Sequence, residues 1–115
     1  MIHIVGVKCR PDQEEKFSKW FNEKHVLDLL KFKGLRRATR YQLLYRDGKN
    51  PVTPDMEYPI YLGVYEFDNQ QDFEAYEASP ELAEAHKNLL ETWAKDPFER
   101  VWRVQYRALK TWENR

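Results

Sequence analysis

The feature that most constrains the fold is the order in which two residue periodicities alternate along the chain. Apolar side chains recur at every second position in some segments, as in strands, and at every third or fourth position in others, as in helices. The strand-like segments cover residues 2–7, 35–46, 60–67 and 101–112, and the helical segments cover residues 11–32 and 69–96. The sequence therefore predicts elements in the order βαββαβ.

Prolines, a glycine and capping residues mark where these elements end. Pro11 begins the first helix, and Gly34 follows its end. Asp68 is the expected cap of the second helix, Ser79-Pro80 restarts that helix and Pro97 ends it. Acidic residues follow Pro11, where the positive end of the helix dipole favours them. Residues 47–55 are rich in turn formers and form a connection.

Short connections and right-handed crossovers fold this order into a four-stranded antiparallel sheet with both helices on one face. This is the ferredoxin-like arrangement of an α+β protein. A chain of 115 residues suits a single domain over residues 1–115.

Two helices cover only one face of such a sheet, yet the strands carry apolar residues on both. In the third strand, Ile60, Leu62 and Val64 alternate with Tyr61, Tyr65 and Phe67. A second copy packed sheet against sheet would bury the uncovered face, so we expect a homodimer with a chamber between the sheets. The side chains expected to point into this chamber are Arg40, Gln42, Tyr61, Tyr65, Arg103 and Gln105.

Composition narrows the class of protein. The chain is 42% hydrophobic and 33% charged, which excludes a disordered chain and a membrane span. Its formal net charge is zero, although residues 1–50 carry 12 basic and 6 acidic side chains and residues 51–115 carry 7 and 13. The two halves should attract each other within a monomer or across a dimer. With one cysteine and no apolar leader, we expect a cytoplasmic protein.

The first helix and the next strand carry a distinctive combination of residues. Trp20-Phe21-Asn22-Glu23-Lys24-His25-Val26 is followed by Leu29-Leu30, Gly34-Leu35 and Arg40-Tyr41, and later by Tyr65-Glu66-Phe67-Asp68, Phe73 and Ser79-Pro80-Glu81-Leu82. This combination resembles the EthD-like branch of the dimeric α+β barrel superfamily, although Leu27 and Lys33 replace two typical prolines. The superfamily contains monooxygenases, isomerases, cyclases and haem-degrading enzymes, so the resemblance implies a fold rather than a reaction.

His25 is the first candidate catalytic residue. A neutral imidazole can accept protons near physiological pH, and the resemblance places His25 where the superfamily's first helix turns toward the cavity. In an unbroken helix, His25 would instead share a stripe with Phe17, Phe21 and Phe32 as a core histidine. Asp28 is the acidic residue that could share its face and orient it.

His86 is the second candidate. Residues 79–87 resemble the helix that carries the iron-ligating histidine of haem-degrading barrels. Two other features of that family are missing, because Tyr76 stands where it has a Trp and residues 3–6 contain no Asn. We therefore expect no cofactor and interpret His86 as a packed or surface histidine. The alternative is that His86 binds haem.

Strand residues form the third candidate group. Arg40 and the Tyr61 hydroxyl are expected to stabilise negative charge on a carbonyl oxygen, or else Arg40 faces solvent at the sheet rim. The residues expected to line the binding site are Trp20, Tyr41, Tyr65, His86, Arg103 and Gln105. His3, His25 and His86 are scattered along the sequence, so no metal site is predicted. Tyr58–Gly63 lacks the signature of an RNA-binding strand, which excludes that class.

These observations predict a homodimer that binds a small hydrophobic or aromatic molecule, without nucleic acid or membrane partners. As an enzyme, it would be a cofactor-independent isomerase or cyclase that moves a proton next to a carbonyl, with His25 as the base. The alternatives are a haem-using monooxygenase that depends on His86, and a non-catalytic binding or assembly module whose own side chains fill the chamber.

Overall fold

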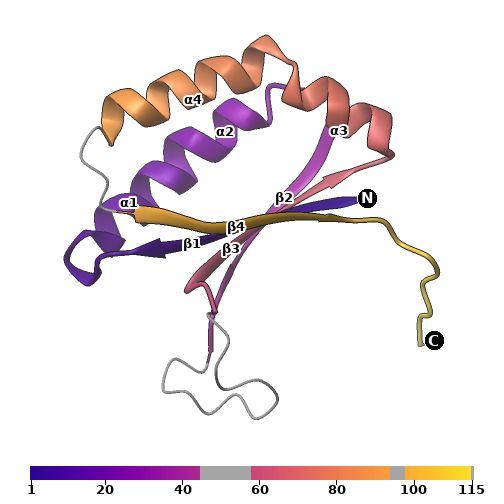
Figure 1. The fold of residues 1–115 in the computed structure, drawn as a ribbon, viewed down its shortest axis with the longest axis horizontal. Helices are drawn as coiled ribbons and strands as arrows, with labels where there is room; N and C mark the ends of the chain where they lie inside the picture. The colour runs from indigo at the N-terminus through magenta and orange to yellow at the C-terminus, as the bar shows by residue number, and fades with distance from the viewer. Residues whose placement is uncertain (45–57, 94–97, 115) are drawn as a thin grey trace.

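The computed structural model describes residues 1–44, 58–93 and 98–114, with only the backbone for residues 98–101. Four strands, β1 (Ile2–Cys9), β2 (Leu35–Gln42), β3 (Tyr61–Phe67) and β4 (Phe98–Tyr106), form one antiparallel sheet in the order β2-β3-β1-β4. The described helices all lie on one face of this sheet (Figure 1). The chain therefore has the predicted α+β, ferredoxin-like fold.

The first helical segment is one continuous rod with a change of pitch. It consists of η1 (Pro11–Gln13, a 3₁₀ turn), α1 (Glu14–Trp20), η2 (Phe21–His25, a π turn) and α2 (Val26–Leu29). The second comprises α3 (Gln70–Glu77) and α4 (Pro80–Thr92). The rod ends at Leu29 rather than at Phe32, whose amide bonds back to the Leu29 carbonyl in the turn that precedes Gly34.

The prediction that the last strand runs to Trp112 is wrong. β4 ends at Tyr106, and residues 107–114 have no regular structure. Tyr106 pairs with Ile2, the first residue of β1, so the sheet offers no strand for the next residues to bond. The predicted connection at 47–55 and the predicted helix end at Pro97 lie outside the described residues.

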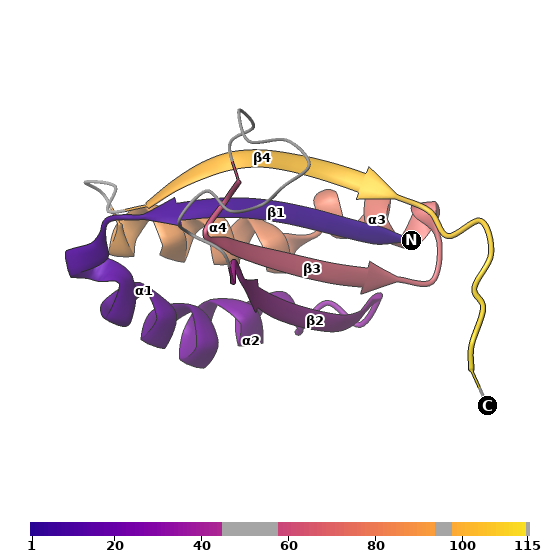
Figure 2. The same cartoon turned by 90° about the horizontal axis from the view of Figure 1, so that it is seen from below.

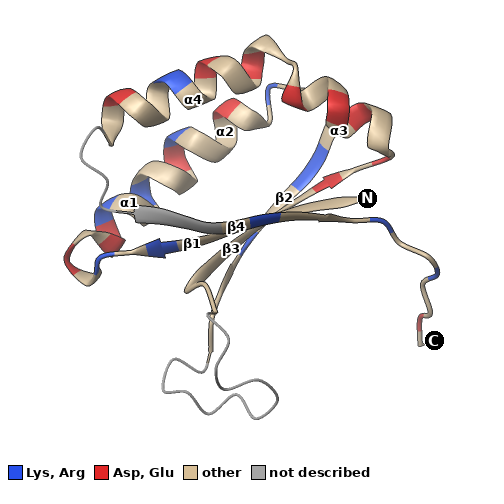
Figure 3. Cartoon of the chain, in the orientation of Figure 1, with Lys and Arg blue, Asp and Glu red and all other residues tan. Residues whose placement is uncertain are grey.

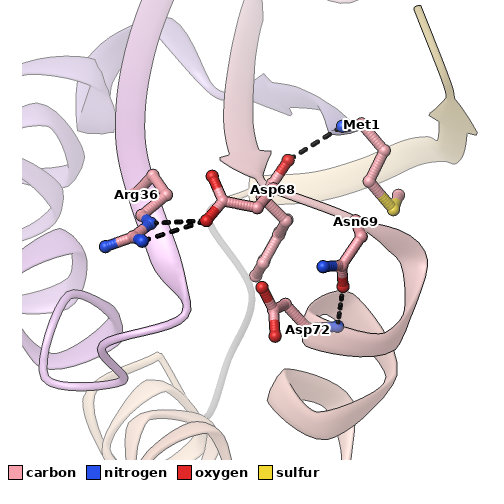
Figure 4. A network of polar contacts seen from close by, with 6 residues as sticks. Met1, Arg36, Asp68, Asn69 and Asp72 are labelled. Carbon is pink, nitrogen blue, oxygen red and sulfur yellow. Dashed lines mark hydrogen bonds and ion pairs between the residues drawn. The ribbon is translucent and has the colours of Figure 1, made fainter.

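Side-chain caps start both helices of the second segment. The Asn69 side chain accepts a hydrogen bond from the Asp72 amide at 2.8 Å, so Asn69 and not Asp68 caps α3 (Figure 4). Asp68 instead accepts two hydrogen bonds from Arg36, at 3.0 and 2.9 Å. Ser79 caps α4 as predicted, because its hydroxyl accepts from the Leu82 amide at 3.1 Å.

Basic residues from the first half of the chain form ion pairs with acidic residues from the second half. Arg36 pairs with Asp68 at 2.9 Å, and Arg37 pairs with Glu66 at 3.5 Å, so β2 is tied to the end of β3 by charge. Acidic side chains also gather on α3 and α4 (Figure 3). The attraction predicted between the halves is therefore present within one chain.

The core lies between the helices and the sheet in two clusters. The larger contains Leu29, Leu35, Tyr65, Phe67, Phe73, Tyr76 and Ala85, and the smaller contains Val7, Cys9, Phe17 and Trp93. Val5 and Phe21 pack against both clusters and join them. The aromatic stripe of the first helix therefore faces the sheet, as its spacing predicts.

The opposite face of the sheet is free of helices (Figure 2). The strand register places Ile2, Ile4, Tyr41, Leu62, Val64, Trp102, Val104 and Tyr106 on it. Tyr41 and Tyr106 are 53% and 60% exposed, and we call these eight residues the open face. An apolar sheet face of this kind is the feature from which a second copy was predicted.

The polar strand residues lie on the other side from the one predicted. Arg40 pairs with Gly63, Arg103 with Val5 and Gln105 with His3, and all of these lie on the helix-covered face together with Tyr61 and Tyr65. In β2 the register shifts between Leu35 and Arg37, which inserts one extra residue. Such a bulge reverses the faces of the later residues of β2, which explains why simple alternation misplaced Arg40. In β3 and in residues 102–106 of β4 the predicted alternation is present, and the error was the choice of face for the polar residues.

Candidate functional site

The π turn in the first helix decides where His25 points. The Val26 amide donates to the carbonyl of Phe21, five residues back. In a regular α-helix, which turns about 100° per residue, His25 and Leu29 would lie roughly 80° and 120° away from Phe17. One additional residue in the turn rotates both back to the side of Phe17, where they are 7% and 2% exposed. Single π turns of this kind occur frequently at functional sites.

His25 faces a cavity of about 80 Å³ between the helices and the sheet. All three histidines of the chain line it: His3 from β1, His25 from η2 and His86 from α4. The other lining residues are Val5, Val7, Phe17, Trp20, Phe21, Leu29, Gly63, Tyr65, Tyr76, Leu82, Leu89 and Arg103. Histidines that are scattered in the sequence thus converge in space, on a mostly apolar cavity.

The surroundings of His25 keep its imidazole neutral. The ring stacks on Trp20 at 4.7 Å between centroids and lies 5.3 Å from Phe21. Its Nδ1 atom is buried and has no hydrogen-bond partner among the described residues. Burial, followed by the nearby charge of His86, lowers the pKa of His25 to about 4. At neutral pH the residue is therefore an unprotonated base with one nitrogen unused.

The residue that orients His25 is not the one expected from sequence. Asp28 forms ion pairs with Lys24 at 3.0 Å and Lys31 at 3.2 Å. The indole of Trp20 holds the imidazole by stacking, and Trp20 is itself held by a hydrogen bond from its Nε1 to Asn88 Oδ1 at 3.2 Å. A contact from α4 thus determines the position of a side chain in η2.

On the sheet side, His3 and Arg103 line the cavity and are already paired, and Gln105 is a partner of His3 that does not line it. Gln105 Nε2 donates to His3 Nδ1 at 3.0 Å, and Arg103 Nη2 donates to Glu77 Oε2 at 3.1 Å. Tyr65 is 4% exposed, its hydroxyl lies over Gly63, and burial raises its pKa far above the usual range. Its phenol therefore stays protonated and can donate a hydrogen bond.

Arg40 and Tyr61 do not share the cavity of His25. The Arg40 guanidinium lies 4.5 Å from the centre of the Tyr61 ring and 5.1 Å from that of Phe21. It lines a second cavity, of about 160 Å³, bounded by Phe21, Asn22, Val26, Ala38, Thr39 and Tyr65. Phe21 and Tyr65 belong to both cavities, so they form the wall between Arg40 and His25. Tyr41 belongs to neither, because it lies on the open face.

Sequence reasoning missed several residues of the first cavity. His3 lies in a strand with Val5 and Val7 at alternate positions, and that spacing could have placed all three on one face. Tyr76 was considered only as a replacement for a Trp, yet it lines the cavity beside His86.

The cavity does not fit a metal centre or a haem. Within residues 1–44, 58–93 and 98–114, no three His, Cys, Asp or Glu side chains are arranged to hold a metal ion. His86 faces a space of about 80 Å³, whereas pockets for even drug-sized ligands measure roughly 300–1,000 Å³. A porphyrin beside His86 would require the helices to separate from the sheet.

Comparison of the whole fold with solved structures identifies its class. HapK from Hahella chejuensis matches with a TM-score of 0.63 at 12% identity, over 99% of both chains. An ethyl tert-butyl ether degradation (EthD) family protein from Bacillus halodurans matches with a TM-score of 0.62 at 12% identity, over 93% of this chain and 99% of that one. A protein from Arabidopsis thaliana, At3g17210, matches with a TM-score of 0.68 at 11% identity, over 97% and 98%. These matches show that the chain shares its fold with the three proteins, one of which belongs to the EthD family that the sequence resembles.

The particular family follows from the sequence itself. Residues 1–100 match the family model described as a domain of unknown function, DUF4286, and the chain belongs to that family. A comparison with curated proteins gives no match. Among the residues that the structure describes, no helix is long and apolar enough to cross a membrane.

Proposed function

We propose that this protein binds a small, largely apolar carbonyl compound in the cavity of His25 and moves a proton within it. The observation that supports this most directly is the buried, neutral imidazole of His25, whose Nδ1 lacks a partner among the described residues. A buried polar atom without a partner costs free energy that a bound group can recover. The aromatic and aliphatic walls favour an apolar ligand.

The proposed reaction is an isomerisation that needs no redox cofactor. His25 accepts a proton from the carbon next to the carbonyl, and the electron pair of that C–H bond moves to the carbonyl oxygen to form an enolate. The imidazolium then returns the proton to another carbon of the same molecule, so atoms and electrons balance. The enolate charge would raise the pKa of His25 during the reaction, because opposite charges at close range favour each other.

Tyr65 is the residue we assign to the enolate oxygen. Its hydroxyl is on the same side of the sheet as His25, at Gly63, and its raised pKa keeps the proton available for donation. This assignment replaces Arg40 and Tyr61, which lie behind Phe21. Trp20 positions the His25 ring, and His86 and Arg103 line the cavity on other sides.

Exchange of carbon-bound protons in D₂O tests the proposal without knowledge of the natural substrate. The probe is 2-butanone, and its proton exchange is followed by NMR. Wild-type protein should speed exchange at the carbon next to the carbonyl at least about tenfold over buffer. His25→Gln should reduce the rate to that of buffer, and Tyr65→Phe should reduce it partly. As the matched control, Lys24→Gln changes an exposed residue of the same turn and should have no effect. Exchange that persists in His25→Gln would contradict the proposal.

We further propose that the working unit is a cytoplasmic homodimer of single-domain subunits, joined through the open face. The support is the concentration of apolar side chains on a sheet face that no described helix covers. Sedimentation at micromolar concentration should show two subunits, and a monomer would overturn this part of the proposal.

A further inference from the structure

The second cavity contains an arginine that has no carboxylate partner among the described residues. Arg40 is half-buried, and its Nη1 donates one long hydrogen bond, of 3.4 Å, to Asn22 Oδ1. Its Nη2 atom is buried and makes no hydrogen bond with the described residues. By contrast, the exposed Arg36 and Arg37 of the same strand each pair with an acid. The least hydrated of these three cations is thus the one without a counter-ion.

Aromatic rings hold the guanidinium in place. It lies 5.5, 5.1 and 4.5 Å from the ring centres of Phe17, Phe21 and Tyr61. Such rings orient a cation but supply no negative charge to replace lost water. Burial lowers the pKa of Arg40, and the described groups that raise it in opposition are the side chains of Tyr61, Tyr65 and Cys9, with no carboxylate among them.

The space beside Arg40 suits a small anion. The cavity of about 160 Å³ lies between the edge strand β2 and the π turn, where Asn22 and Val26 line it opposite Ala38. Because Asn22 Oδ1 accepts from Arg40, its amide nitrogen remains as a second donor. A guanidinium fork and one amide match a planar carboxylate, whereas a phosphate dianion would need more donors.

We propose that the second cavity is a carboxylate site, so that the ligand is a carbonyl acid with its acid group at Arg40 and its carbonyl carbon chain at His25. The two cavities are neighbours, because Phe21 and Tyr65 line both. A ligand with one end in each must pass between these two side chains. Only the placement of the carbonyl end of the ligand at His25 rests on the proposed function. Carboxylate binding at Arg40 does not depend on proton transfer at His25.

Binding of phenylacetate compared with phenylacetamide tests the site, because the two probes share a shape and differ in charge. In calorimetric or NMR titrations at 0.15 M NaCl, the wild type should bind phenylacetate at least about tenfold more tightly. Arg40→Gln should abolish this preference, and Arg37→Gln, on the same strand but exposed, should retain it. His25→Gln should also retain it, which separates failure of this site from failure of the proposed reaction.

A second variant guards against a folding defect in Arg40→Gln. Asn22→Asp is nearly isosteric and supplies a carboxylate at the position that now lies 3.4 Å from Arg40. It should abolish phenylacetate binding while the protein becomes harder to unfold, since the cation gains its counter-ion. Equal binding of the two probes to the wild type, or a preference lost in Arg103→Gln and kept in Arg40→Gln, would overturn the proposal.

Discussion

The two faces of the sheet use similar side chains for different purposes. On the helix-covered face, Tyr65 and Phe67 are each 4% exposed, and all three histidines meet at one cavity between this face and the helices. On the open face, Tyr41 and Tyr106 are more than half exposed. The two faces therefore differ more in the exposed fraction of their side chains than in the types of residue they carry. One face holds the subunit together and carries the candidate chemistry, whereas the other is available for a second subunit.

Removal of a core ring should have the largest effect. Phe17→Ala deletes a side chain that contacts Trp20, Phe21 and Trp93. The unfolding free energy should fall by about 3–5 kcal/mol, since the transfer free energy is lost and a cavity remains. Denaturant unfolding followed by tryptophan fluorescence measures it. A loss below about 1 kcal/mol would mean that the covered face is less tightly packed than its burial indicates.

Acid should weaken the covered face through His25. The unfolded residue titrates near 6.5 and the folded one near 4, so the unfolded state binds the proton more tightly. The stabilisation is complete above pH 6.5 and is lost as the pH falls toward 4, by about 3 kcal/mol. The difference in unfolding free energy between wild type and His25→Gln isolates this contribution from that of the carboxylates. If the two proteins lose stability in parallel over this range, the imidazole is not held neutral.

A charge on the open face should act on association and leave folding intact. Val64→Lys places an ammonium group among Ile4, Leu62 and Val104. The proposed dimer should dissociate at least about tenfold more readily, which is about 1.4 kcal/mol. Analytical ultracentrifugation measures this, and circular dichroism of the diluted variant checks the fold. A variant that unfolds would show that this face supports the monomer as well.

A helix cap should have the smallest of these effects. Ser79 is 6% exposed, and its hydroxyl accepts from the Leu82 amide while it donates to the Tyr76 carbonyl at 2.7 Å. Ser79→Ala should cost about 1 kcal/mol of unfolding free energy. Chemical denaturation would detect it. Hydrogen exchange that increases at the start of α4 and stays unchanged in β1 would place the loss in the helix layer.

Predictions from the sequence succeed where the cause is local. Pro80 after Ser79 marks the start of α4, and the apolar runs of β1 and β3 identify strands, because backbone and side-chain preferences act over a few residues. The cap at Asn69 was missed because two adjacent residues can both cap a helix. Asp68 was instead drawn to Arg36, a partner far away in the sequence.

The sequence predicted part of the candidate site. His25, Trp20, Tyr65, His86 and Arg103 were named from sequence and all line the first cavity. Their expected surroundings were wrong in two respects. The bulge in β2 placed Arg40 on the helix-covered face, and Asp28 bonds to lysines on its own helix. A bulge and a choice between ion-pair partners depend on neighbours that a linear pattern does not contain.

The sequence by itself determined the order of the elements, the ferredoxin-like topology and the surplus of apolar strand residues, because periodicity and short connections follow directly from the chain. Only the tertiary structure decided which face of the sheet each polar residue occupies and that the three histidines share one cavity. One extra residue in the π turn and one in the bulge each change the orientation of the side chains that follow in the same helix or strand. The π turn and the bulge are stabilised by packing between segments that are distant in the sequence.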